Sequence, residues 1–114
     1  MNPLALRDQD LAVLRRTLGR FAFVREARVF GSRASGMARR ASDLDLAVSA
    51  PDASGRDWAE LCEALEKAPL IYEIDLVRPE KIGNSRLLER IHREGVRVFP
   101  EEPIPSPTPP RASA

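Results

Sequence analysis

The segment VFGSRASG, residues 29–36, is followed after five residues by SDLDLAV, residues 42–48. Each half contains a short apolar run of the kind that forms a strand. A strand that ends in glycine and serine before a short helical turn directs backbone N–H groups at one point, where a phosphate group can bind. The first half therefore predicts a phosphate site at Gly31 and Ser32.

The second half carries two carboxylates, Asp43 and Asp45, within an apolar strand. Successive side chains of a strand point to opposite faces, so both carboxylates share one face while Leu44 and Leu46 enter the core. Proteins usually hold Mg²⁺ through one or two carboxylates together with substrate phosphates. Gly-Ser and Asp-x-Asp are each common in turns and edge strands, but their combination in this order indicates a catalytic site.

A third carboxylate, Asp75, lies in an apolar run at residues 70–77, on the same predicted face as Glu73. A charge within so apolar a strand is costly unless it is paired or binds metal. Two-metal phosphoryl chemistry usually needs a further carboxylate beside the first pair. Asp43, Asp45 and Asp75 are therefore the predicted catalytic residues and ligands, and two Mg²⁺ ions are the predicted metals.

The rest of the chain predicts an α+β domain over residues 1–99, with a small mixed sheet and packed helices. Helical spacing of apolar residues predicts helices at residues 4–18, 54–67 and 84–93, each facing the core, and strands are predicted at 27–30, 44–48, 70–77 and 96–99. A turn or two of helix is expected within residues 32–37. The proline-rich residues 100–114 cannot repay the entropy of ordering by burial, so a disordered tail is expected there.

Composition excludes several classes of protein. The 18 basic and 17 acidic residues give a net charge of +1, so no direct nucleic-acid partner is expected. No apolar run approaches the roughly 20 residues of a membrane span, and no export signal is visible, so a cytoplasmic location is expected. Cys62 is the only cysteine and is expected to be a small core side chain. The arginines that precede the acidic pair form a local basic segment suited to a metal and a triphosphate: Arg25, Arg28, Arg33, Arg39 and Arg40.

The pattern GSRAxG at residues 31–36, then five residues and SDxDL at residues 42–46, closely resembles the signature of the MNT family. These are the minimal nucleotidyltransferases of the DNA polymerase beta superfamily, and the resemblance covers residues 4–99. It implies a polymerase beta-like fold in which Gly31 and Ser32 hold the triphosphate of ATP and the two aspartates of the second half bind metal.

The resemblance also implies that Asp75 is the third carboxylate and helps to deprotonate the acceptor. Arg33 and Ser42 belong to the signature and are expected to contribute to nucleotide binding. Many members have arginine where this chain has Ser35, which leaves open a contact from that position to the nucleotide or to a partner.

Stand-alone members resemble the antitoxin of HEPN/MNT toxin-antitoxin pairs, in which the MNT protein transfers AMP to a tyrosine of a HEPN ribonuclease. Nucleotidyltransferases that modify antibiotics or nucleic acids usually carry an additional helical domain for the acceptor, whereas a proline-rich segment follows Phe99 here. The resemblance thus implies a magnesium-dependent protein adenylyltransferase that forms a hetero-oligomer with a HEPN toxin.

Two alternatives remain open. The chain could be a binding module that neutralises a toxin by occlusion, although a purely steric inhibitor has no need of three carboxylates on strand faces. It could instead be a nucleotidyltransferase for a small molecule, which would turn over without a protein partner. The sequence leaves open the base preference, the number of AMP groups transferred, the acceptor residue and the oligomeric state.

Overall fold

The computed structural model describes residues 6–31 and 43–100, with the backbone alone at Asp43. Its elements are, in order, α1 (Asp8–Gly19), β1 (Glu26–Phe30), β2 (Asp43–Ser49), α2 (Gly55–Lys67), β3 (Glu73–Val77), the 3₁₀ turn η1 (Pro79–Lys81), α3 (Ser85–Glu94) and β4 (Val96–Phe99). The strands form one four-stranded sheet in the order β3-β2-β1-β4. Strand β1 is antiparallel to β2 and β4, whereas β2 and β3 are parallel. This mixed sheet with packed helices confirms the predicted α+β class.

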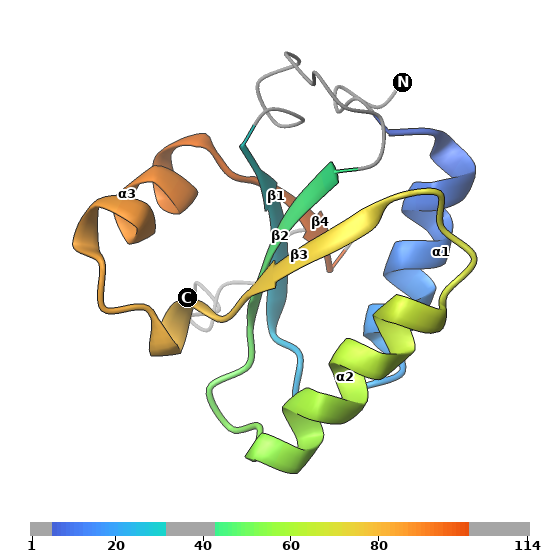
Figure 1. Cartoon of the computed structure of the whole chain (residues 1–114), viewed down its shortest axis with the longest axis horizontal. Helices are drawn as coiled ribbons and strands as arrows, with labels where there is room; N and C mark the ends of the chain where they lie inside the picture. The colour runs from blue at the N-terminus through green and yellow to red at the C-terminus, as the bar shows by residue number, and fades with distance from the viewer. Residues whose placement is uncertain (1–5, 32–42, 101–114) are drawn as a thin grey trace, which may run out of the picture.

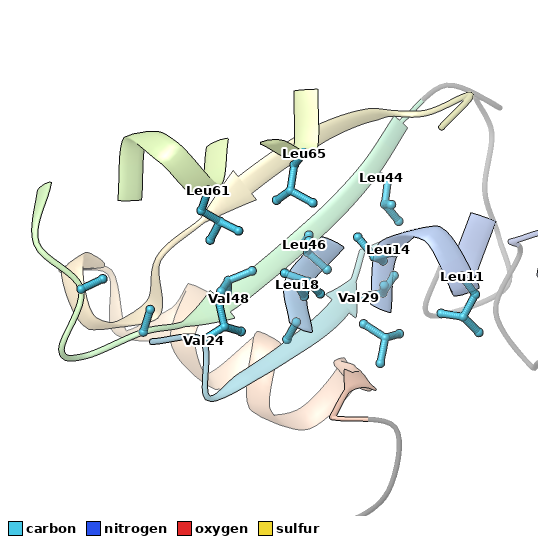
Figure 2. Close-up of a cluster of buried hydrophobic side chains, with 14 residues drawn as sticks. Leu11, Leu14, Leu18, Val24, Val29, Leu44, Leu46, Val48, Leu61 and Leu65 are labelled. Carbon is cyan, nitrogen blue, oxygen red and sulfur yellow. The ribbon is translucent and has the colours of Figure 1, made fainter. Parts of the chain in front are cut away.

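The main core lies between one face of the sheet and the helices α1 and α2 (Figure 1). Alternate residues of β2 point into it, so Leu44, Leu46 and Val48 are almost fully buried. Leucines of the two helices pack against these β2 residues, as Figure 2 shows: Leu11, Leu14 and Leu18 from α1, and Leu61 and Leu65 from α2. This arrangement confirms the helical faces predicted for α1 and α2.

Helix α3 lies on the opposite face of the sheet (Figure 1), where it packs on a second, smaller apolar cluster. Its Ile91 is buried against Phe30 of β1 and Ala47 of β2, with Leu87 partly buried beside them. The sequence predicted a single core that all helices would face, and this was wrong for α3. Periodicity marks which side of a helix is apolar but not which face of a sheet the helix covers.

Side-chain caps fix where two of the helices begin. Ser54 Oγ accepts a hydrogen bond from the N–H of Asp57, whose carboxylate accepts one from the N–H of Ser54, both at 3.0 Å. This capping box starts α2. The Asn84 side chain caps α3 by accepting hydrogen bonds from the N–H groups of Arg86 and Leu87. The predicted helices 54–67 and 84–93 are therefore correct to within one residue at each end.

Strand β3 and helix α1 are both shorter than predicted. Pairing of β3 with β2 begins at Glu73 opposite Asp43, so residues 70–72 of the predicted strand precede the ladder. Helix α1 begins at Asp8 rather than at residue 4, and residues 1–5 lie outside the described part. The predicted turn at 32–37 and the predicted tail beyond Pro100 also lie outside it. Within residues 6–31 and 43–100, no helix is long and apolar enough to span a bilayer.

Arg78 connects the loop between β2 and α2 to the segment after β3. We call the contacts of its side chain the Arg78 clamp. Its Nη2 donates to the carbonyl oxygens of Ala50 and Ala53 at 2.8 and 2.7 Å. Its guanidinium lies over the ring of Trp58, 5.1 Å from the centroid. Nearby, Glu80 accepts hydrogen bonds from the Ser49 hydroxyl and the N–H of Ala50, at 2.6 and 3.0 Å. The clamp therefore joins the ends of both strands of the parallel pair.

One acidic residue, for which the sequence predicted no role, is buried. Asp10, in the first turn of α1, is 2% exposed and accepts hydrogen bonds from Arg7 Nε and Nη2 at 2.6 and 3.0 Å. These hydrogen bonds hold the pKa of the Asp10 carboxyl below its ordinary value of 3.8. The hydroxyl of Tyr72 accepts from the N–H of Arg7 at 3.3 Å, which links this ion pair to the start of β3.

We expect Asp10→Asn to lower the urea midpoint of unfolding at pH 7. Because the folded-state pKa is depressed, the stabilisation from ionised Asp10 is fully present above pH 3.8 and is lost as the pH falls through the folded pKa. The difference between wild type and variant should therefore shrink at pH 3 and below. Asp8→Asn, at an exposed position of the same helical turn, is the control and should change the midpoint less. A constant difference across this pH range would contradict the prediction.

Candidate active site

Strand β2 lies between β1 and β3 and aligns the candidate acids (Figure 1). Asp45 is in register with Phe30 on β1 and with Asp75 on β3. Neighbouring strands lie about 4.8 Å apart, and residues in register point to the same face. Asp45 and Asp75 therefore stand side by side on the face that carries α3. The sequence placed both residues on strands, and their shared face is the arrangement that a common metal site requires.

A fourth acid joins this row. Glu73 is in register with Asp43. This pair lies two residues before Asp45 and Asp75 on the same two strands. The period of two along β3 put Glu73 on the face of Asp75, but no role was predicted for it because the register of β2 against β3 was not known. By the positions of their backbones, four acids form this acidic row: Asp43 and Asp45 on β2, and Glu73 and Asp75 on β3.

One argument for Asp75 was wrong. The sequence implied a charge buried in an apolar strand, whereas Asp75 and Glu73 are both exposed in the structure. Strand β3 is an edge strand, and the buried apolar cluster under α3 reaches only its last residue, Val77. Burial therefore supplies no reason for an acid at position 75. The case for it as a ligand now depends on its register with Asp45, which is half-buried.

The turn after β1 brings Gly31 against the Asp45 carboxylate. Gly31 has φ of +76°, a left-handed conformation that glycine adopts without strain. A Cβ atom at this position would lie 3.3 Å from Cγ of Asp45 and would overlap its Oδ2. The absence of a side chain at Gly31 thus makes room for the carboxylate, while a phosphate contact at Gly31 stays a prediction. The sequence had anticipated only the phosphate.

The donor set suits a hard divalent cation, because the described part of the row offers only carboxylate oxygens. Asp45 and Asp75 could supply two such oxygen ligands, and the backbone of Asp43 places a third acidic residue on the same face. Among the described side chains there is no group of three metal-ligating residues. The Asp43 side chain lies outside them, as do Ser32, Arg33 and Ser42, so the roles of these residues in binding metal or nucleotide stay predictions.

Two arginines of the predicted basic segment do not lie at this end of the sheet. Arg25 precedes β1 and pairs with Asp52 at 3.6 Å, on the loop after β2. Arg28 pairs with Glu26 and donates to the carbonyl oxygen of Gly95 at 3.3 Å. Their sequence position before Asp43 is misleading, because β1 runs from the far end of the sheet toward the acids. Arg33, Arg39 and Arg40 lie outside the described residues.

The family follows from a comparison with known proteins. The family described as "Polymerase beta, Nucleotidyltransferase" matches residues 12–103, which include all four strands and the acidic row. The chain belongs to this nucleotidyltransferase family. A comparison with proteins of curated function gives no match.

Solved structures share the fold of this nucleotidyltransferase. A toxin-antitoxin complex with AMP-PNP is 24% identical, with a TM-score of 0.64 over 79% of this chain and 73% of that chain. A mutant of the toxin-antitoxin complex MntA-HpeT is 25% identical, with a TM-score of 0.58 over 81% and 71% of the two chains. A protein from Shewanella oneidensis is 19% identical, with a TM-score of 0.57 over 82% and 72%. Similar structures therefore include antitoxin complexes, and this agrees with the resemblance to MNT antitoxins.

Proposed function

We propose that this nucleotidyltransferase is an antitoxin that transfers AMP from ATP to a tyrosine of a partner HEPN toxin. The observation that carries the proposal is the register of Asp45 with Asp75, beside the left-handed turn at Gly31. This geometry supports the proposal because two carboxylates lie beside a turn whose glycine has no side chain to obstruct a phosphate. The toxin-antitoxin complexes among similar structures, one of them with AMP-PNP, support the choice of partner and nucleotide.

In the proposed site, Asp43, Asp45 and Asp75 would hold two Mg²⁺ ions, with Gly31, Ser32, Arg33 and Ser42 around the triphosphate. Bound Mg²⁺ would polarise the phosphoryl oxygens and neutralise charge on the leaving pyrophosphate. The half-buried position of Asp45 fixes its carboxylate against the Gly31 turn. Asp75 is exposed on the edge strand, where an acceptor hydroxyl can reach it from solvent.

The proposed reaction exchanges one bond at the α-phosphorus of ATP for another. The tyrosine oxygen attacks the α-phosphorus of ATP, an O–P bond forms, and the bond between the α-phosphorus and the bridging oxygen breaks. Pyrophosphate leaves with that oxygen. The phenolic proton passes to the Asp75 carboxylate, which is exposed on β3.

The test is transfer of label from ATP carrying a labelled α-phosphate to the product of the neighbouring gene, which the proposal expects to be a HEPN protein, in the presence of Mg²⁺. We expect Asp45→Asn and Asp75→Asn each to reduce the rate by more than about 100-fold, since partners that merely orient a metal ligand are worth about 10- to 100-fold. EDTA should abolish transfer, and added Mg²⁺ should restore it. The matched control is Asp52→Asn, which removes an exposed acid at the other end of the sheet.

Three results would contradict the proposal in different ways. No label on the HEPN protein with the wild-type chain would exclude protein adenylylation by this pair. Full neutralisation of the toxin by Asp45→Asn would indicate occlusion instead of transfer. Turnover of ATP onto a small molecule without the HEPN protein would indicate the third function considered above.

A further inference from the structure

An open groove runs between α2 and the edge strand β3, on the face of the sheet opposite the acidic row. Its volume is about 1120 Å³, and its floor is apolar, formed by Leu65 of α2 and by Ile74 and Leu76 of β3. Trp58 and Tyr72 line it further along. Except for Leu65, these side chains pack against the main core but remain only partly buried. Helix α2 therefore leaves part of the apolar face of β3 uncovered.

The rim of this groove is acidic. Glu63 and Glu66 on α2 line it, and no lysine or arginine is among the described residues that line it. Glu63 is paired with Lys67 at 3.0 Å. Glu66 forms no ion pair with any residue in the described ranges. An apolar floor beside the negative charge of Glu66 fits a ligand with an apolar stripe next to positive charge.

The groove opens at the edge of the sheet, because β3 pairs with one strand only in the part of the chain that the structure describes. Just before this strand, Ile71 is the one large hydrophobic residue of the described chain that is exposed, at 54%. The groove and Asp75 lie on opposite faces of the same strand, so one strand thickness separates them. A protein held in the groove can therefore extend around this edge to the acidic row without crossing another element.

We propose that the groove between α2 and β3 docks a basic, amphipathic helix of the protein acceptor. This inference rests on the proposed function, which requires a protein acceptor. A helix is the natural cover for a sheet face beside another helix, because each element must bury its apolar side against a second layer. A helix 10 to 12 Å wide fills roughly 500 Å³ per turn, so a groove of about 1120 Å³ admits about two turns.

Charge reversal at the rim tests this directly. Glu66→Lys should weaken binding of the HEPN protein by about 5- to 10-fold, because a rim charge mainly sets electrostatic attraction. The loss should shrink at about 1 M salt, where the screening length falls to about 3 Å. The matched control is Glu60→Lys, the same change on the same helix at an exposed residue outside the groove. Binding would be measured by calorimetry, with ATP binding to each variant as the check that the nucleotide site is intact.

The only cysteine of the chain provides a second readout, since Cys62 lines the groove. Burial raises the pKa of its thiol, so alkylation is best followed at pH 8 or above. Bound HEPN protein should slow the alkylation of Cys62 at least about 5-fold in the wild type, in line with occupation of the groove, and less in Glu66→Lys. Mass spectrometry of this chain measures the rate.

These outcomes separate docking from chemistry. Equal affinities for Glu66→Lys and Glu60→Lys, or unchanged alkylation of Cys62, would overturn the docking proposal even if AMP is transferred. Dimers of this chain that Glu66→Lys dissociates, with unaltered affinity for the HEPN protein, would assign the groove to a second copy. Faster alkylation of Cys62 after removal of residues 101–114, without any effect of the HEPN protein, would assign it to the tail. Groove-dependent binding without AMP transfer would leave docking standing and exclude the proposed reaction.

Discussion

Gly31→Ala is expected to reduce AMP transfer by at least about 100-fold, since a 1 Å misplacement of a reacting group can cost about that much. An alanine Cβ would overlap Oδ2 of Asp45, so the carboxylate must move from its place beside the turn. The left-handed φ of +76° adds about 1 to 2 kcal/mol of backbone strain for any other residue. The measurement is the rate of label transfer to the HEPN protein, with the melting temperature of the variant.

Gly83→Ala is the matched control for this substitution. A Cβ at Gly83 would meet no atom within 4 Å, and the backbone there is not left-handed. We expect transfer at the wild-type rate and little change in melting temperature. Wild-type activity in Gly31→Ala would show that Asp45 tolerates displacement. It would contradict the prediction that transfer depends on the fit between the turn and this carboxylate.

The second large effect is expected on stability, from Arg78→Ala in the Arg78 clamp. This change removes a charged donor from the carbonyl oxygens of Ala50 and Ala53 and uncovers the ring of Trp58. Hydrogen bonds from charged groups contribute about 1.5 to 3 kcal/mol each, so we expect the free energy of unfolding to fall by about 3 kcal/mol. Urea denaturation at pH 7 measures it. Arg78→Lys should recover only part of the loss, because an ammonium group lacks the planar fork of guanidinium.

Arg56→Ala controls for the loss of an arginine as such. The Arg56 side chain is 90% exposed, and its contact with Glu60 is 3.9 Å long. Exposed pairs of this kind contribute little, so a change below about 0.5 kcal/mol is expected. Equal destabilisation by the two substitutions would show that the clamp makes no special contribution to stability.

Strand and helix patterns in the sequence predicted most of the fold because short-range rules govern them. The alternation in residues 44–48 predicted β2, and the spacing of Trp58, Leu61 and Leu65 predicted α2, both within a residue or two. The strand at Val96–Phe99 was predicted with the correct ends. The 3₁₀ turn at Pro79–Lys81 was missed, since three residues are too few to show a period.

The parts of the site that could not be predicted depend on long-range pairing. Which residue of β3 faces Asp45 follows from the register between β2 and β3, and this revealed Glu73 as the neighbour of Asp43. Exposure of Asp75 follows from the position of β3 at the sheet edge, which the composition of the strand does not encode. The Gly31 contact with Asp45 likewise joins two segments whose distance in space is set by the whole sheet.

The parallel register between β2 and β3 also limits how this chain can vary in length. Residues of β3 alternate between the apolar floor and the acidic row, so one residue inserted or deleted between Glu73 and Val77 would exchange the two sets for the rest of the strand. Ile74 or Leu76 would then turn toward the face of the acidic row, and an acid would enter the core. Within this strand, descendants of the sequence can change residue types one at a time, but gaining or losing a single residue would disrupt both faces together.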